Sequence, residues 1–181
     1  MEIKAEFPQL DIDLFASKLT KQLDTYCSWQ PDPGSTYVDA FSIDWNNFHF
    51  YAFPPFSLIP RCLQKIQQDR AKGILIVPVW PTQTWFPLVL QLLFRQPWIY
   101  RPSPHLLQHA AHNQRHPLYQ KLQLMVCPLS GVPSDNTTYL KTLQISSCRH
   151  GDRVPKNNIR PTSTNGWSFV VKGQSITVFQ R

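Results

Sequence analysis

Four short segments of the chain carry the side chains that could bind or transform a ligand. They are 13–17 (DLFAS), 38–45 (VDAFSIDW), 53–56 (FPPF) and 78–85 (PVWPTQTW). Each lies beside a run of apolar or aromatic residues that is typical of a β-strand. Because ligands of open parallel sheets bind outside the carboxyl ends of the strands, we expect these segments to meet on one rim of a sheet.

The Pro54-Pro55 pair admits two interpretations. Neither proline has a backbone N–H to donate to a sheet ladder, so the pair can simply end the strand predicted at 48–52 (FHFYA). Since Phe53 and Phe56 flank the pair, it can also frame a loop that handles a nucleobase.

Other chemistries have less support in the sequence. Asp11 and Asp13 would share one face of a strand, and Asp39 and Asp44 could join them in a two-metal hydrolase. No G-x-S-x-G or G-x-G-x-x-G pattern occurs, which argues against a serine hydrolase of that type and a dinucleotide dehydrogenase.

Four histidines fall at i, i+4, i+7 and i+11: His105, His109, His112 and His116. A helix would align them, and imidazoles in that arrangement could bind zinc or nickel. No carboxylate joins the row, so the preferred interpretation is an exposed polar helix face, and we predict no metal site.

The pattern of apolar residues predicts alternating strands and helices. Strands are expected within 10–16, 26–29, 48–52, 74–80, 97–100 and 122–129, and helices within 17–26, 57–73, 82–95 and 103–114. Gly73 is the expected stop of the second helix. The alternation predicts an α/β fold with a Rossmann-like, mostly parallel sheet and flanking helices.

The amino-acid composition of the chain changes after residue 131. Residues 132–166 are polar and without period, so they are expected to form a linker or to be disordered. The run 167–179 (WSFVVKGQSITVF) alternates around Lys172-Gly173 and predicts a β-hairpin. We therefore divide the chain into an α/β domain at 8–131 and a polar basic tail at 132–181.

The net charge of +7 belongs mostly to the tail. Of 18 Lys and Arg and 11 acidic residues, 141–181 holds seven basic residues and one acid, which leaves 11 against 10 in 1–140. A basic tail can bind polyanions, whereas the alternative is a solvated linker.

Composition indicates a folded intracellular protein. The 181 residues are 42% hydrophobic and 13% aromatic, which suits one domain with some extra length. The polar start predicts no secretory signal, and no apolar run is long enough for a membrane span. Four scattered cysteines are expected to be reduced thiols: Cys27, Cys62, Cys127 and Cys148. We expect a cytoplasmic or nuclear location.

Several short motifs of this sequence resemble motifs that occur in the same order in two families. Residues 10–90 resemble phage-type (Dam-like) adenine-N6 DNA methyltransferases, which carry D-x-D-x-x-A-S, D-A-x-x-x-D-W and (N/D)-P-P-(Y/F) where this chain has DIDLFAS, DAFSIDW and FPPF. Residues 8–131 look even more like a segment of DIRS/Ngaro-type retroelement polyproteins, downstream of reverse transcriptase and RNase H. That segment also reads DLFAS, Y-x-SW-x-PDP, VDAFS-x-DW, YAFPPFSLI and PVWP-x-Q-x-WFP.

The methyltransferase resemblance implies a role for each matched residue. Asp13 and Ser17 would lie by the methionine end of S-adenosylmethionine, and Asp39 would accept hydrogen bonds from its adenine. Phe56 would stack on the target base, with Pro54 and Pro55 as the frame of the motif. In the family an Asn or Asp before the prolines accepts a hydrogen bond from the exocyclic amine.

This chain has Phe53 at that position, which offers no acceptor. We therefore expect a retroelement-derived fragment with a degenerate methyltransferase-like domain, impaired in catalysis and accessory to the handling of DNA or RNA. The alternatives are an active S-adenosylmethionine-dependent adenine methyltransferase and a non-catalytic spacer that holds neighbouring polyprotein domains apart.

Overall fold

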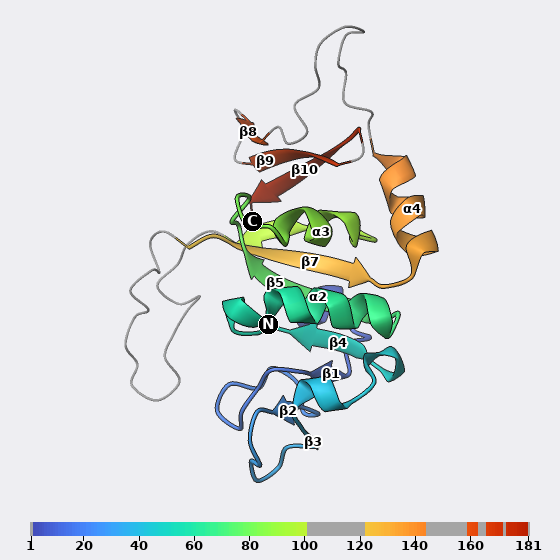
Figure 1. The fold of residues 1–181 in the computed structure, drawn as a ribbon. Helices are drawn as coiled ribbons and strands as arrows, with labels where there is room; N and C mark the ends of the chain where they lie inside the picture. The colour runs from blue at the N-terminus through green and yellow to red at the C-terminus, as the bar shows by residue number, and fades with distance from the viewer. Residues whose placement is uncertain (1, 101–121, 144–158, 163–165, 172, 181) are drawn as a thin grey trace, which may run out of the picture.

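A mixed β-sheet with few helices forms the framework of the molecule (Figure 1). The computed structural model describes residues 2–100, 122–143, 159–162, 166–171 and 173–180. In these ranges the eight-stranded sheet has the order β1-β4-β5-β7-β6-β10-β9-β8, and β2 and β3 pair beside it. The protein is therefore of the α/β class, as the sequence predicts.

The elements are short apart from two helices and four strands. The strands are β1 Ile12–Asp13, β2 Cys27–Ser28, β3 Tyr37–Val38, β4 His49–Ala52, β5 Lys72–Pro78, β6 Trp98–Tyr100, β7 Leu124–Ser130, β8 Ile159–Thr162, β9 Gly166–Val171 and β10 Gln174–Gln180. The helices are α1 Glu2–Glu6, α2 Ile59–Gln68, α3 Phe86–Gln91 and α4 Pro133–Thr142, with 3-10 turns η1 Ala40–Ser42, η2 Trp45–Asn47 and η3 Phe56–Leu58.

The sheet is mixed rather than mostly parallel, which corrects the prediction. β1, β4 and β5 run parallel, but β7 is antiparallel to both β5 and β6. β10 is parallel to β6, β9 is antiparallel to β10, and β8 is antiparallel to β9. A buried strand shows the same apolar run in either direction, so the alternation of elements could not reveal the direction of β7.

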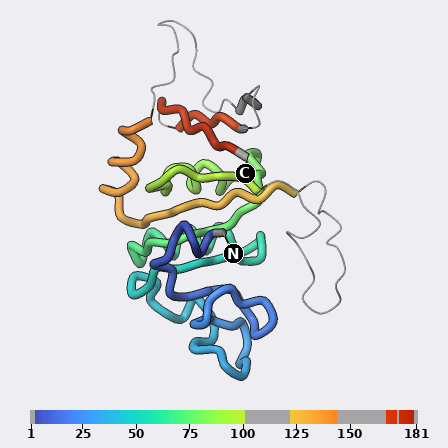
Figure 2. The backbone as a smooth tube through the Cα atoms, turned by 180° about the vertical axis from the view of Figure 1, so that it is seen from behind, coloured from blue at the N-terminus to red at the C-terminus, as the bar shows by residue number. Residues whose placement is uncertain are grey.

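Apolar side chains fill both faces of the sheet. Alternate residues of β5 point to opposite sides, so Leu75 and Val77 join the larger core while Ile74 and Ile76 join the smaller one. Helices α2 and α3 cover the first face in Figure 1, and α1 covers the other in Figure 2. This two-sided burial explains the continuous apolar run of β5.

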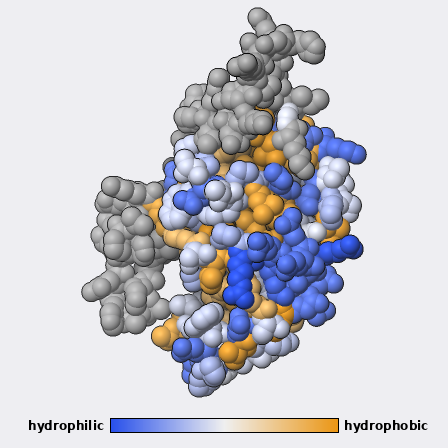
Figure 3. Space-filling view, viewed as in Figure 1, coloured by the Kyte–Doolittle hydropathy of each residue, from blue (hydrophilic) through white to orange (hydrophobic). Residues whose placement is uncertain are grey.

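Helix α2 lies where the sequence predicts a helix. It buries Ile59, Cys62, Leu63 and Ile66, and its outer face is hydrophilic (Figure 3). The predicted stop at Gly73 is wrong, because the helix ends at Gln68 and Gly73 belongs to β5. A Cβ at Gly73 would lie 2.2 Å from the Phe50 carbonyl oxygen, so the missing side chain serves strand packing.

The helix predicted at 17–26 is absent, and turns occupy this segment. The Ser17 backbone N–H bonds the Thr20 hydroxyl, and the Gln22 N–H bonds the Asp13 carboxylate. Leu23 is buried but Leu19 is 73% exposed, so the pair does not form one apolar face. Side-chain acceptors have here replaced the helical hydrogen bonds.

The other predicted elements have mixed outcomes. Short strands do occur within 10–16 and 26–29, and the strands predicted at 48–52, 97–100 and 122–129 are confirmed as β4, β6 and β7. Helix 82–95 shrinks to α3, where Pro87 lies in the first turn. The helix predicted at 103–114, with its four histidines, lies outside the described residues.

Helix α4 corrects the expectation that residues 132–166 are irregular. Pro133 opens it, and Asp135 in its first turn pairs with Lys72 at 3.0 Å. The buried Asn136 amide donates to three backbone carbonyls, those of Leu92, Leu93 and Ser130. Leu140 is the one apolar residue of this helix buried in the core, and the other contacts that hold the helix are largely polar, so its sequence shows no apolar period.

The predicted hairpin around Lys172-Gly173 is confirmed as β9 and β10. It does not stand alone, because β10 pairs with β6 and extends the sheet. Four of its side chains enter the larger core: Phe169, Val171, Ile176 and Val178. The sheet thus includes strands from both sides of residue 131.

Candidate functional site

The spatial order of the first strands reverses between β1 and β4. A parallel bridge from Asp13 to Tyr26 joins β1 to β2, and β2 pairs in parallel with β3. The order in space is therefore β3-β2-β1-β4-β5, and the chain leaves β1 toward one side and β4 toward the other. The carboxyl ends of the strands leave a crevice at such a switch point.

A pocket of about 400 Å³ opens at this switch point. Its lining comes from the segments that follow β1, β2, β3 and β4: Leu14, Phe15, Ala16, Ser28, Trp29, Asp39, Ala40, Pro55, Ser57 and Leu58. The predicted segments 13–17, 38–45 and 53–56 each contribute to this lining. The fourth predicted segment, 78–85, does not.

Asp39 is the acidic residue of the pocket lining, and its backbone is strained. Its φ of 56° lies in the left-handed region that few non-glycine residues adopt. The side chain caps η1, with Oδ1 accepting from the Phe41 N–H at 3.0 Å, and the Asp39 N–H donates to Ser28. Among the described residues no donor reaches Oδ2, so this oxygen can accept from a ligand.

Asp13 lies beside the pocket but does not line it. The side chain is 2% exposed, and its two carboxylate oxygens accept from the backbone N–H groups of Phe15 and Gln22. Burial raises the pKa of Asp13 to about 6, against the opposing effect of these two bonds. Asp13 therefore shapes the turn after β1.

Ser17 lies in the same turn and also outside the lining. Its hydroxyl is 3.0 Å from the Thr20 hydroxyl, and its N–H donates to the same oxygen. The predicted cofactor residues are thus brought into one region of the fold, but of the three only Asp39 reaches the pocket.

The motif 53–56 follows β4 directly, as predicted. Pro54 is buried and Pro55 is exposed on the pocket wall, while the phenylalanine rings turn elsewhere. The Phe56 ring packs edge-on against Trp80 at 5.1 Å between centroids, and Phe53 lies 6.4 Å from Phe56. Hence neither ring lines the pocket.

Trp29 is the pocket residue that the sequence reasoning missed. Its side chain is 70% exposed although it lines the cavity, which leaves an indole surface open to a ligand. Trp29 belongs to the Y-x-SW-x-PDP motif on which the expected resemblance to the retroelement segment rests.

A cluster of aromatic side chains around Trp45 packs against residues of the pocket lining. Trp45 is fully buried and packs against Phe15, Phe41 and Phe50, and its indole N–H donates to the Ala40 carbonyl at 2.7 Å. Since Phe15 and Ala40 belong to the pocket lining, these contacts tie two of the lining segments to the core.

The described residues hold no group of three or more His, Cys, Asp or Glu side chains placed to bind a metal. Asp44 caps η2 with its Oδ1 on the Asn46 N–H, and Asp11 precedes β1 at the opposite end from the pocket. The carboxylates considered for a two-metal site therefore do not converge.

The comparisons add no relative to this picture. No protein-family model matches the chain, and no curated protein matches it either. Within the described ranges, no helix is both long and apolar enough to cross a membrane.

Proposed function

We propose that this chain is a degenerate adenine-N6 methyltransferase-like domain, derived from a retroelement polyprotein, that keeps a nucleoside pocket for S-adenosylmethionine and has lost efficient methyl transfer. The observation that carries the proposal is the convergence of three predicted segments on one pocket at the reversal of strand order. Its role would be accessory, in the handling of DNA or RNA beside neighbouring polyprotein domains.

The strand order supports a Rossmann-like origin. Doubly wound sheets with the order 3-2-1-4-5 bind nucleotides in the crevice between strands 1 and 4. Here β3-β2-β1-β4-β5 has this order, and the pocket occupies the corresponding crevice. The volume of about 400 Å³ falls within the usual size of small-molecule sites.

Two side chains suit an adenine ring. Asp39 Oδ2, which no donor of the described residues reaches, can accept a hydrogen bond from the exocyclic amine, and the exposed Trp29 indole can stack on the ring plane. A strained residue at a pocket wall is also common at binding sites, because the strain is tolerated where it positions a functional group.

Methyl transfer is impaired for two reasons. Phe53 supplies no acceptor for the target amine, and loss of one such catalytic hydrogen bond lowers rates by about 10²–10³. In addition the Phe56 ring packs on Trp80, so it does not face the pocket as a stacking wall.

Calorimetry with S-adenosylmethionine tests the pocket. We expect micromolar binding by the wild type and a loss of about tenfold or more in Asp39→Asn, whose amide keeps the bond to Phe41 but replaces the free acceptor by a donor. The matched control is Asp44→Asn, which alters the same kind of cap on η2 outside the pocket. Absence of binding at millimolar ligand, or equal losses in both variants, would refute the pocket assignment.

A methyl-transfer assay separates the alternatives. Transfer to adenine by the wild-type chain would favour the active methyltransferase, and binding without transfer favours the degenerate domain. If Phe53→Asn gains transfer, the lesion lies at that residue. A chain that binds neither cofactor nor nucleic acid is the spacer.

A further inference from the structure

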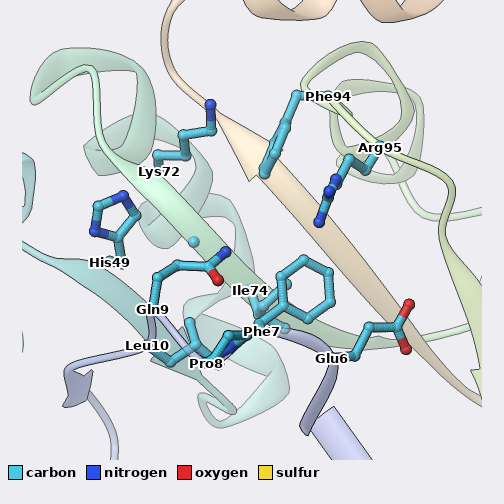
Figure 4. A pocket seen from close by; sticks show the side chains of 11 residues that line it. Glu6, Phe7, Pro8, Gln9, Leu10, His49, Lys72, Ile74, Phe94 and Arg95 are labelled. Atoms are coloured by element: carbon cyan, nitrogen blue, oxygen red, sulfur yellow. The ribbon is translucent and has the colours of Figure 1, made fainter. Parts of the chain in front are cut away.

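A second hollow, which we call the amino-end groove, lies at the other end of the strands. It has a volume of about 600 Å³ and is shown in Figure 4. The lining comes from the segment before β1, the first residues of β4 and β5, and the connection from α3 to β6: Glu6, Phe7, Pro8, Gln9, Leu10, His49, Lys72, Gly73, Ile74, Phe94 and Arg95. None of these residues lines the pocket described above.

Arg95 presents a positive charge that a buried ring holds in place. Its guanidinium carbon lies 5.6 Å from the centroid of the Phe7 ring, and Figure 4 shows it directed toward that ring. Phe7 is itself buried, and its ring stacks on the Trp98 ring with 5.8 Å between the centroids. No described carboxylate pairs with Arg95, so the N–H edges of the guanidinium are available to an anion.

Lys72 brings a second cation into the groove from β5. The ammonium lies 4.4 Å from the Phe94 ring centroid and 3.0 Å from Asp135. This pair lowers the pKa of Asp135, mainly through the hydrogen bond from Lys72. Since an ammonium has three donors and Asp135 takes one, Lys72 can still donate to a ligand that enters the groove.

His49 and Gln9 add polar groups on the remaining side. His49 is exposed at the start of β4, and the Gln9 amide lies between it and Phe7 in Figure 4. The lining holds one acid, Glu6, whose carboxylate points away from Lys72 and His49 at the edge of the view. Polar and cationic side chains from four segments of the chain therefore line the groove.

We propose that the amino-end groove binds a phosphate group, with Arg95 as its main contact and Lys72 and His49 beside it. A phosphate has several oxygens in different directions, so it can accept from donors that lie on different sides of the groove, and Arg matches it with two parallel N–H bonds. The aromatic faces of Phe7 and Phe94 already carry cations, so the groove offers charge rather than base stacking.

The phosphate can belong to a free nucleotide or to the backbone of a nucleic acid strand, and two probes distinguish these sources. Fluorescence anisotropy follows a labelled single-stranded DNA of mixed sequence at several salt concentrations, and calorimetry follows ADP. The test variant is Arg95→Gln. Its matched control is Arg61→Gln, because Arg61 is also an exposed arginine stacked on a phenylalanine, at 3.9 Å from the Phe41 centroid.

We expect Arg95→Gln to weaken at least one probe by about tenfold, and Arg61→Gln to change neither by more than about twofold. For the DNA, the slope of log K against log salt should also become less negative by about 0.7, as expected when one phosphate contact on a single strand is lost. Weakening of DNA alone assigns the groove to a strand, and weakening of ADP assigns it to a nucleotide.

Equal effects of the two arginine variants on both probes would overturn the proposal, because only net charge would then matter. Undiminished binding in Arg95→Gln, or no binding of either probe, would overturn it as well. Repeating the Arg95→Gln comparison in the Asp39→Asn background disables the proposed nucleoside pocket for the adenine of ADP. The effect of Arg95→Gln should persist there, so failure here is distinguishable from failure of the S-adenosylmethionine pocket.

Discussion

The buried carboxyl group of Asp13 makes the stability of this protein depend on pH in a defined direction. Burial raises its pKa from the ordinary value of 3.8 to about 6. The folded state then keeps a proton that the unfolded state has released, so stability is full below about pH 4 and falls as the pH rises toward 6. At about 1.4 kcal/mol per pKa unit, the whole effect is about 3 kcal/mol.

Asp13→Asn removes this titration while keeping the shape of the side chain. One amide oxygen can still accept from Phe15 or Gln22, and the other bond is lost at a cost of about 1 kcal/mol. The lost bond costs the variant the same amount at every pH. Because about 1 kcal/mol of the effect is already lost at pH 4.5, the wild type should lose about 2 kcal/mol of unfolding free energy relative to the variant between pH 4.5 and pH 7.5. Near neutral pH the variant should equal or exceed the wild type in stability.

Urea unfolding at a series of pH values, followed by tryptophan fluorescence, measures this difference. Asp11→Asn removes the same charge from an exposed position and reports the effect of net charge alone. A difference between wild type and Asp13→Asn that stays constant or rises with pH would show that the two N–H bonds outweigh burial, and our reasoning on Asp13 would be wrong.

Other substitutions test the packing. Gly73→Ala should destabilise the fold by about 2–3 kcal/mol in urea unfolding, because the new Cβ would meet Phe50 at under 3 Å, whereas Gly34→Ala should cost only about 1 kcal/mol for its φ of 96°. Asn136→Ala should cost about 2 kcal/mol, since three buried carbonyls lose their shared donor. The Cys127 thiol is fully buried and its pKa is raised by burial, so it should resist a thiol reagent until the chain unfolds.

The sequence predicts best those elements whose burial is one-sided or complete. Helix α2 repeats apolar residues on one face, and β5 is a run of β-branched residues, so both follow from side-chain pattern. The direction of β7 and the existence of α4 do not follow from it. The first depends on where the chain returns after residues 101–121, and the second depends on Lys72 and on carbonyls far along the sequence.

The candidate pocket was predictable in position but not in detail. Segments that follow parallel strands must reach one rim, which brought Asp39 and Pro55 to the pocket. The rotation of individual side chains is set by neighbours, so Phe56 turned to Trp80 and Asp13 turned into the core. Trp29 lies in the segment 26–29 that the sequence predicts as a strand, and its 70% exposure marks it as a surface residue of the pocket.

Asp39 and Asp44 make the same local contact at different places in the fold. Each follows the same rule, in which an aspartate caps a 3-10 turn through the backbone N–H two residues on. Asp44 does so at an ordinary φ of −84°, but Asp39 adopts a φ of 56°. The cap alone therefore does not explain the strained angle, which costs about 1–2 kcal/mol. The proposed nucleoside pocket offers one explanation: at the switch point the strained backbone places the Asp39 carboxylate on the pocket wall, with an oxygen that no described donor reaches.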